Sequence, residues 1–317
     1  MKRFRFVLWT TAVMVLAGAA SAQDFPAKPI RFIVGPGPDV LARIVGQKLT
    51  DAWGQQILVD QRPGAGGIIA AETVAKSPAD GYTMLLSTGT YTTIPSLYKK
   101  VPYDFVRDLQ PVTLLATLPF LLVAHPSVPA NNVQQLIQLA RAHPGQLNYA
   151  SSGNGTTAHL AGEMLKSMAK INIVHVPYKG TVPGVTDLVA GQVHIMFAII
   201  QSSLPYVQAG RLKALAVSSA KRAASAPQVP TIAESGLPGY EFISWNGVHL
   251  PAATPRPVAG KLNTELLRII ALPDVKEKML GLGMDIAGGT PEEFGALVKS
   301  DIAKWAKVIR EAGIHAE

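Results

Sequence analysis

The sequence has no cysteine and few aromatic residues, which make up 7% of its 317 residues. The missing cysteine excludes disulfides, thiolate metal sites and cysteine nucleophiles. Without disulfides the chain depends on its hydrophobic core. With 48% hydrophobic residues, a chain of this length can bury a large core, which usually divides between two domains. Few aromatic and many small residues favour helices packed closely on parallel sheets.

A hydrophobic run at the N-terminus spans residues 6–18, after three basic residues and before Ala20-Ser21-Ala22. This is the pattern of a secretory signal peptide with small residues at its cleavage site. We therefore predict export of the chain, with residues 1–22 removed by cleavage after Ala22. The alternative, a retained membrane anchor, is less favoured because the run is shorter than the roughly 20 residues that span a bilayer.

Acidic residues are scarcer than basic ones, with 21 against 29. Removing the signal peptide takes away three basic residues, so 26 basic residues face 21 acidic ones and the net charge is +5. The basic residues are scattered and do not form a stripe with interleaved aromatics, which argues against nucleic acid as a partner. A mildly positive field would help to draw in small anions.

Short apolar runs alternate with helical patterns along the chain, which is the rhythm of βαβ units. This predicts parallel sheets with helices on both faces and ligands at the carboxyl ends of the strands. Helix boundaries are also readable: Asp39 stands at an N-cap and Gly54 after the last turn of residues 40–53. Thr290 and Glu293 match a capping box at the start of a C-terminal helix.

Two extended apolar segments, residues 116–127 and 239–255, lead out of one αβ block and into another. If both cross between lobes, the lobes are joined by a two-strand hinge with a cleft between them. We then expect one lobe from residues 23–120 and 246–317, and a second from residues 121–245. A simple tandem of two domains, the alternative, needs only one crossing.

The stretch ASSGNGTTAHLAGEML, residues 150–165, predicts a strand, a glycine-rich turn and a helix. Its glycine spacing is that of a dinucleotide site, but the next strand ends in Pro177-Tyr178-Lys179 and offers no carboxylate for a ribose. The turn instead suits a carboxylate, bound by backbone N–H groups and short polar side chains. The candidate ligands are Ser151, Ser152, Gly153, Asn154, Gly155, Thr156 and Thr157; alternatively, these groups only cap the helix.

Two more strand ends carry candidate binding residues. After the first strand come Gly35, Gly37 and Asp39, which either contact a ligand or connect strand to helix. At the end of the third strand, residues 87–91 form either part of the site or an ordinary polar loop. Gly89 lies among four candidate hydroxyl donors: Ser87, Thr88, Thr90 and Tyr91.

Groups for catalysis are scarce. Ser151 lies near His159 in sequence, yet no Gly-x-Ser-x-Gly elbow is present, and His159 would face away from the turn in a straight helix. The remaining histidines are isolated in sequence and offer no paired metal ligands. We therefore expect a binding protein and no enzyme, with no metal and no cofactor.

Seven motifs, in order, resemble the substrate-binding receptors of tripartite tricarboxylate transporters, the Bug receptors, over essentially the whole chain after residue 22. They are FPAKPIRFIV, VDQRPGAGGIIAAETVAKSPADGYTMLLST, PSLYKKVPYD, LNYASSGNGTTAHLAGEML, VHVPYKGTVPGVTDLVAGQVHIMF, RLKALAVSSAKR and VPTIAESGLPGYE. The resemblance implies an α/β type II periplasmic binding protein, a Venus flytrap of two Rossmann-like lobes joined by a two-strand hinge.

The resemblance also implies a function in the periplasm. Such a receptor captures a small carboxylate, often a dicarboxylate or an amino acid, between its lobes and delivers it to a membrane permease. The implied site includes the glycine turns of residues 35–39 and 151–157, Ser87 to Tyr91 and Ala198. Tyr91, Tyr178 and Trp245 are our candidates for contacting the rest of the ligand; the alternative for Trp245, on the second crossing segment, is packing at the hinge. We expect a monomer. The alternative partner is a membrane sensor kinase.

Two departures from the family pattern stand out. Only four residues separate Val34 from Asp39, where relatives have a longer loop, so we expect a wider or weaker pocket on that side. Ala198 stands where many relatives have Asp, which favours a ligand without an ammonium group.

Overall fold

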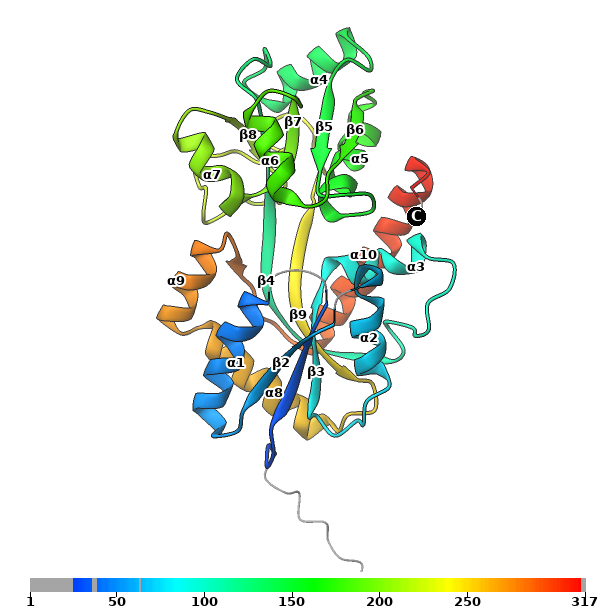
Figure 1. Cartoon of the computed structure of the whole chain (residues 1–317), viewed down its shortest axis with the longest axis vertical. Coiled ribbons are helices and arrows are strands. Elements are labelled where there is room, and N and C mark those ends of the chain that lie inside the picture. The colour runs from blue at the N-terminus through cyan, green and yellow to red at the C-terminus, as the bar shows by residue number, and fades with distance from the viewer. Residues whose placement is uncertain (1–24, 36–38, 63, 315–317) are drawn as a thin grey trace, which may run out of the picture.

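The computed structural model describes residues 25–35, 39–62 and 64–314, which form two α/β lobes stacked along the long axis of the molecule (Figure 1). The predicted signal peptide and Gly37 lie outside the described residues. Among the residues described, no helix combines the length and the hydrophobicity that a membrane crossing requires.

The first lobe has a parallel sheet in the order β2-β1-β3, as the βαβ pattern predicts. Its N-terminal elements are β1 (Ile30–Val34), α1 (Val40–Trp53), β2 (Ile57–Gln61), η1 (Ala65–Gly67), α2 (Ile68–Ala75), β3 (Thr83–Thr88), η2 (Gly89–Thr92) and α3 (Ile94–Leu97). The C-terminal part of the chain adds α8 (Arg256–Ile270), α9 (Pro273–Gly281), β10 (Asp285–Ile286) and α10 (Pro291–Ala312). Helices α1 and α8 pack on one face of the sheet, and α2 and α10 on the other.

The second lobe repeats the pattern with the parallel order β6-β5-β7. Its elements are α4 (Val133–Ala142), β5 (Asn148–Ser151), α5 (Thr157–Ala169), β6 (Val174–Pro177), α6 (Thr181–Val189), β7 (Ile195–Ile199), α7 (Ile200–Gln208) and β8 (Lys213–Val217). Two buried clusters, one on each face of this sheet, form its core.

Two long strands, β4 (Leu109–Ala124) and β9 (Ile243–Pro251), run between the lobes (Figure 1). The first part of β4 pairs with β9 as far as Pro119, and its last five residues pair with β7 and β8 of the second lobe. One 16-residue strand thus belongs to both sheets. The predicted hinge of two crossing segments is confirmed.

Helix α10 makes a third connection. Its N-terminal half places Phe294 and Val298 in the core of the first lobe, whereas Trp305 and Ile309 lie in the core of the second. The last turns of α10 therefore pack on the second lobe, although the sequence predicted residues 246–317 in the first. The exact lobe boundaries stay a prediction.

The predicted helix ends occur where the sequence indicated. Gly54 ends α1 in the left-handed conformation, with φ of 67°, and its N–H bonds the carbonyl of Thr50. At the start of α10, Thr290 and Glu293 form the reciprocal capping box.

Ser218 connects the two crossing segments inside the second lobe. Its Oγ accepts the Phe120 N–H at 2.8 Å and donates to the Phe242 carbonyl at 2.6 Å. Both partners are buried, so we expect Ser218→Ala to leave a donor and an acceptor unsatisfied and to lower the free energy of unfolding by about 2–4 kcal/mol. Urea denaturation measures this loss. The exposed Ser300→Ala is the control, and an equal effect of both substitutions would contradict the role of Ser218.

Candidate functional site

A cavity of about 330 Å³ lies at the carboxyl ends of β1 and β3, between the lobes. Its walls come from the first lobe, from both crossing strands and from the start of α7 in the second lobe. The lining residues are Val34, Gly35, Val40, Leu41, Gly66, Leu86, Thr88, Thr90, Tyr91, Leu118, Ile199, Gln201, Asn246, Leu282 and Met284. This is the position where ligands bind in doubly wound α/β folds.

Most of the cavity wall is apolar, but four polar side chains reach it without a hydrogen-bond partner in the described part of the chain. These are the hydroxyls of Thr88 and Thr90 and the amides of Gln201 and Asn246. The carboxamides and hydroxyls can each donate a hydrogen bond to a carboxylate oxygen. Small-molecule sites usually have this composition, a mostly apolar wall with a few polar groups.

Tyr91 supplies a fifth polar group. Its hydroxyl is buried and has no hydrogen-bond partner in the regions that the structure describes. The ring lies close against Gly35 and Gly67, and a Cβ added to Gly35 would stand 2.5 Å from the Tyr91 hydroxyl oxygen. Burial raises the pKa of Tyr91, so the phenol keeps its proton and is a hydrogen-bond donor.

The N-terminus of α1 also borders the cavity, through Val40 and Leu41. Asp39 occupies the N-cap position, as predicted, but its side chain does not cap the helix. Its carboxylate instead bonds the Arg43 guanidinium at 2.5 and 2.8 Å, which lowers the pKa of Asp39. The backbone N–H groups of the first turn therefore have no side-chain cap, and their partial positive charge favours an anion.

A second cavity, of about 390 Å³, contains the glycine turn of the second lobe. Gly153, Asn154 and Gly155 line it together with residues 177–179, opposite Leu97 and Tyr98 of the first lobe. The lobes therefore contact each other through α3, and the predicted site residues are divided between two neighbouring cavities.

Two backbone groups predicted to bind a carboxylate are used inside this turn. The Gly153 N–H donates to Ser151 Oγ at 3.1 Å, and the Gly155 N–H donates to His159 Nδ1 at 3.0 Å. The Thr156 hydroxyl donates to the Gly153 carbonyl and does not cap α5. The N–H groups of residues 157–159 consequently have no partner among the described residues and are the donors that remain at this turn.

Beneath the turn lies a buried polar cluster that the sequence did not predict. Ser151 Oγ is 2.6 Å from His175 Nε2, and the rings of His175 and His159 stack at 3.8 Å between centroids. Glu163 accepts hydrogen bonds from Tyr149 and Lys166 beside them. Burial lowers the pKa of both histidines to about 4, so both rings are neutral at neutral pH.

The first lobe has a matching pair at the end of β3. Ser87 Oγ is 2.7 Å from His249 Nδ1 and donates to the Gly247 carbonyl at 3.0 Å. Ser87 and Ser151 are both 0% exposed, so a substrate has no access to either hydroxyl. Each serine–histidine pair supports the backbone at a strand end, and neither serine lines a cavity.

The predicted site residues thus fall into three groups: those that line the first cavity, those that line the second, and those that line neither. Gly35, Thr88, Thr90 and Tyr91 line the first cavity, and Gly153, Asn154, Gly155 and Tyr178 line the second. Eight other predicted site residues line neither of these two cavities: Asp39, Ser87, Gly89, Ser151, Ser152, Thr156, Thr157 and Ala198. Ala198 is 0% exposed and packs in the core of the second lobe, because it alternates along β7 with Ile199, which does line the cavity.

Tyr178 lines the second cavity, but its hydroxyl donates to Asp187 at 2.8 Å, and burial together with this carboxylate raises its pKa to about 12. The candidate residue Trp245 is buried in the first lobe, where its Nε1 donates to Asp301 at 2.7 Å.

Several cavity residues escaped the sequence analysis. Asn246 is a polar residue within an apolar crossing segment, which was a usable signal. Leu118, Leu282 and Met284 had no such signal, because apolar cleft residues look like core residues in sequence. Gln201 had none because one polar residue in a helical pattern is ordinary.

The fold and the cavity between the lobes define a two-lobed solute-binding protein. A family model described as the tripartite tricarboxylate transporter family receptor matches residues 41–314, and the chain belongs to this family. A relative from Pseudomonas sp. strain P51, from the tcbD-tcbE intergenic region, is 42% identical over 98% of this chain and 95% of its own length. Protein BugT of Bordetella pertussis is 35% identical over 94% of this chain and 93% of its own length.

Solved structures agree with the fold. Rpa4515 of R. palustris, solved with adipate, has a TM-score of 0.80 and 37% identity, covering 92% of this chain and 99% of its own. MatC of Rhodopseudomonas palustris, with bound malate, has a TM-score of 0.75 and 30% identity, covering 90% of this chain and 100% of its own. The type II periplasmic binding-protein fold inferred from the sequence is confirmed.

The stacked histidines make the stability depend on pH. The pKa of His159 and His175 is about 4 in the folded chain, against about 6.5 when unfolded. Between these values the unfolded chain binds protons that the folded chain does not, so the free energy of unfolding falls as the pH drops through this window. Urea unfolding of residues 23–317 at about pH 7.5 and about pH 5 measures the loss.

His175→Gln should reduce this pH dependence without abolishing it, because His159 and the buried His249 remain. The exposed His143→Gln serves as the matched control. If both variants keep the wild-type difference between the two pH values, the stacked pair is not its source.

Proposed function

We propose that this chain is a periplasmic receptor that captures a small carboxylate, a dicarboxylate or a related organic acid, between its lobes and delivers it to a tripartite tricarboxylate-type membrane permease. The observation that carries the proposal is the cavity at the ends of β1 and β3, where unpartnered hydroxyls and amides of both lobes and the hinge converge in an apolar wall. The ligands in two relatives' structures, adipate and malate, are consistent with it.

The donor set favours a carboxylate over a cation. Thr88, Thr90 and Tyr91 offer hydroxyl hydrogens, and the uncapped first turn of α1 adds a partial positive charge. Among the residues that the structure describes, no Asp or Glu side chain lines this cavity. Several converging donors and exclusion of water must supply the affinity, because each contact contributes little by itself.

The apolar wall of the cavity further limits which carboxylates can bind. Val34, Leu86, Leu118, Leu282 and Met284 offer no hydrogen bonds to a hydroxylated chain, but they suit methylene groups. We infer a preference for a longer, unsubstituted diacid. Because burying a CH₂ contributes about 0.8 kcal/mol, adipate with two more methylenes than succinate should bind roughly tenfold more tightly.

A ligand screen tests the proposal. The chain from residue 23, refolded to remove any carried ligand, is melted with mono-, di- and tricarboxylates and amino acids. A ligand present at about 100 times its Kd stabilises the fold by about 2.7 kcal/mol, which gives a measurable rise in Tm. We expect dicarboxylates to raise the Tm and succinate to do so less than adipate. A panel without any shift contradicts carboxylate binding.

Thr90→Val tests the site itself. It keeps the side-chain shape but removes a hydroxyl that has no protein partner, so we expect the fold to be unaffected and the Kd of the best dicarboxylate to rise about tenfold. Isothermal titration calorimetry measures the Kd. Thr264→Val, on the exposed face of α8, is the control and should bind like wild type. An unchanged Kd in Thr90→Val would place the ligand elsewhere.

A further inference from the structure

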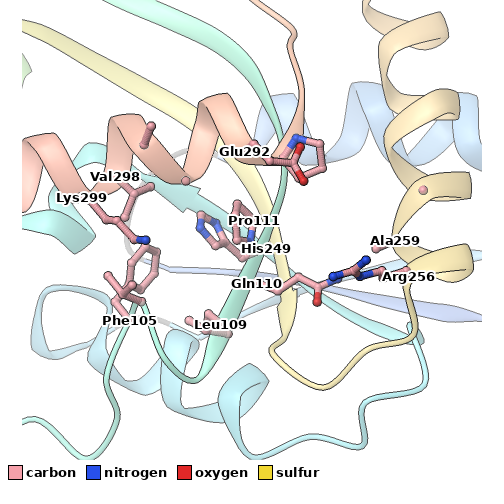
Figure 2. Close-up of a pocket in the computed structure, with 15 residues that line it drawn as sticks. Phe105, Leu109, Gln110, Pro111, His249, Arg256, Ala259, Glu292, Val298 and Lys299 are labelled. Carbon is pink, nitrogen blue, oxygen red and sulfur yellow. The ribbon is translucent and has the colours of Figure 1, made fainter.

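The first lobe contains a groove of about 730 Å³ that shares no lining residue with the cavities between the lobes. It lies between the start of β4 and the first turns of α8 and α10 (Figure 2). Phe105, Leu109, Pro111 and Val298 form its apolar surface. Its volume lies within the range of small-molecule sites.

Two cations at the groove have no partner. Arg256 and Lys299 make no ion pair or hydrogen bond with any residue that the structure describes. Figure 2 shows them on opposite sides of His249. Arg256 is also the first residue of α8, where the helix dipole disfavours a positive charge and where the first turn has no acidic residue. The helix gains nothing from this cation, which is exposed and accessible to a ligand at the groove.

His249 presents a free ring nitrogen to the groove. The side chain lines the groove and is only 1% exposed. Ser87 has one hydroxyl hydrogen, which it donates to the Gly247 carbonyl. We assign the hydrogen of the 2.7 Å contact between Ser87 Oγ and His249 Nδ1 to the ring, because this tautomer lets Ser87 keep its bond to the Gly247 carbonyl. Nδ1 then carries the proton, and Nε2 is a bare acceptor without a partner among the described residues.

Burial keeps this ring neutral by lowering the pKa of His249 to about 3. Nε2 lies open to the groove, where a ligand can donate a hydrogen bond to it. His249 therefore selects a ligand that carries an O–H or N–H group.

Glycine at position 260 keeps the groove open. A helix-interior glycine costs about 1 kcal/mol relative to alanine. Nothing lies within 4 Å of a Cβ added to Gly260, so neither close packing nor backbone conformation requires a glycine there. A larger side chain would extend into the groove instead.

We propose that this groove is a second binding site, for a small monocarboxylate with an apolar ring and a hydroxyl or N–H donor. Arg256 binds the carboxylate, Lys299 at the other end of the groove adds positive charge, the apolar surface holds the ring, and the donor bonds Nε2 of His249. Glu292, the one acidic residue in the lining, opposes a second carboxylate. This separates the groove from the dicarboxylate site proposed between the lobes.

The probe is 4-hydroxybenzoate, which combines a carboxylate, a ring and a hydroxyl donor. The chain from residue 23 is labelled with ¹⁵N in the histidine rings, and the His249 signals are assigned by their loss in His249→Phe. We expect the free protein to show the Nδ1–H tautomer at His249. Titration with 4-hydroxybenzoate should shift the Nε2 resonance, whereas benzoate, which lacks the donor, should shift it far less.

Variants test the groove. Gly260→Leu should fill it and abolish the His249 shift, while Thr264→Leu on the exposed side of α8 should leave the shift intact. Arg256→Ala should weaken binding of the probe roughly tenfold without changing the tautomer. Thr90→Val, in the cavity between the lobes, should bind the probe at the groove like wild type.

Three results would overturn the proposal. The first is an Nε2–H tautomer in the free protein. The second is an absent His249 shift at millimolar probe, or one of equal size with benzoate. The third is a shift that survives Gly260→Leu but is lost in Thr90→Val, which would mean that the probe binds only between the lobes.

Discussion

The ladder between β4 and β9 is the constraint on which the two-lobed structure depends. Because β4 is hydrogen-bonded within both sheets, the lobes cannot separate without breaking a continuous strand. Any change in their relative orientation must be absorbed where β4 passes from one sheet to the other, near Pro119 and Phe120. Ser218 joins both crossing segments there, and α10 packs on both cores. The cavity lies beside these strands, so the hinge itself supplies Leu118 and Asn246 to the site.

Each lobe uses a buried serine–histidine pair to hold the strand end that supports its part of the cleft. Buried polar groups are tolerated only when they are hydrogen-bonded, so these pairs also make the local geometry specific. Ser151 and His159 accept the N–H groups of the glycine turn and fix its shape. In the first lobe, Ser87 instead donates to the Gly247 carbonyl and contacts Nδ1 of His249, whose second ring nitrogen opens on the groove of α8 and α10. His249 thus lines the groove, and its partner Ser87 precedes Thr88, which lines the cavity between the lobes.

Much of the fold was predictable from local signals. The helix of residues 40–53 has its predicted ends, because Asp39 and Gly54 mark them by conformation and position. The strands are short apolar runs that only a sheet with both faces covered can bury, which explains why the βαβ pattern was readable. Site residues were predicted less well: Thr88, Thr90 and Tyr91 reach the cavity, but Ser87 does not, since successive side chains of a strand face opposite ways and the sequence does not say which face is open.

The sequence by itself determined the alternation of strands and helices, the two crossing segments and the family, because these depend on periodicity, capping residues and ordered motifs. Only the tertiary structure decided which polar groups are free. Gly153 and Gly155 have the right chemistry for an anion, yet their N–H groups are already bonded to side chains of the second lobe. Asn246, Arg256 and Lys299 are ordinary in sequence. They become candidate binding residues only because, within the described part of the chain, the fold leaves them without partners at a cavity. Hydrogen-bond satisfaction is a property of neighbours in space, and for these residues the neighbours lie far apart in the chain.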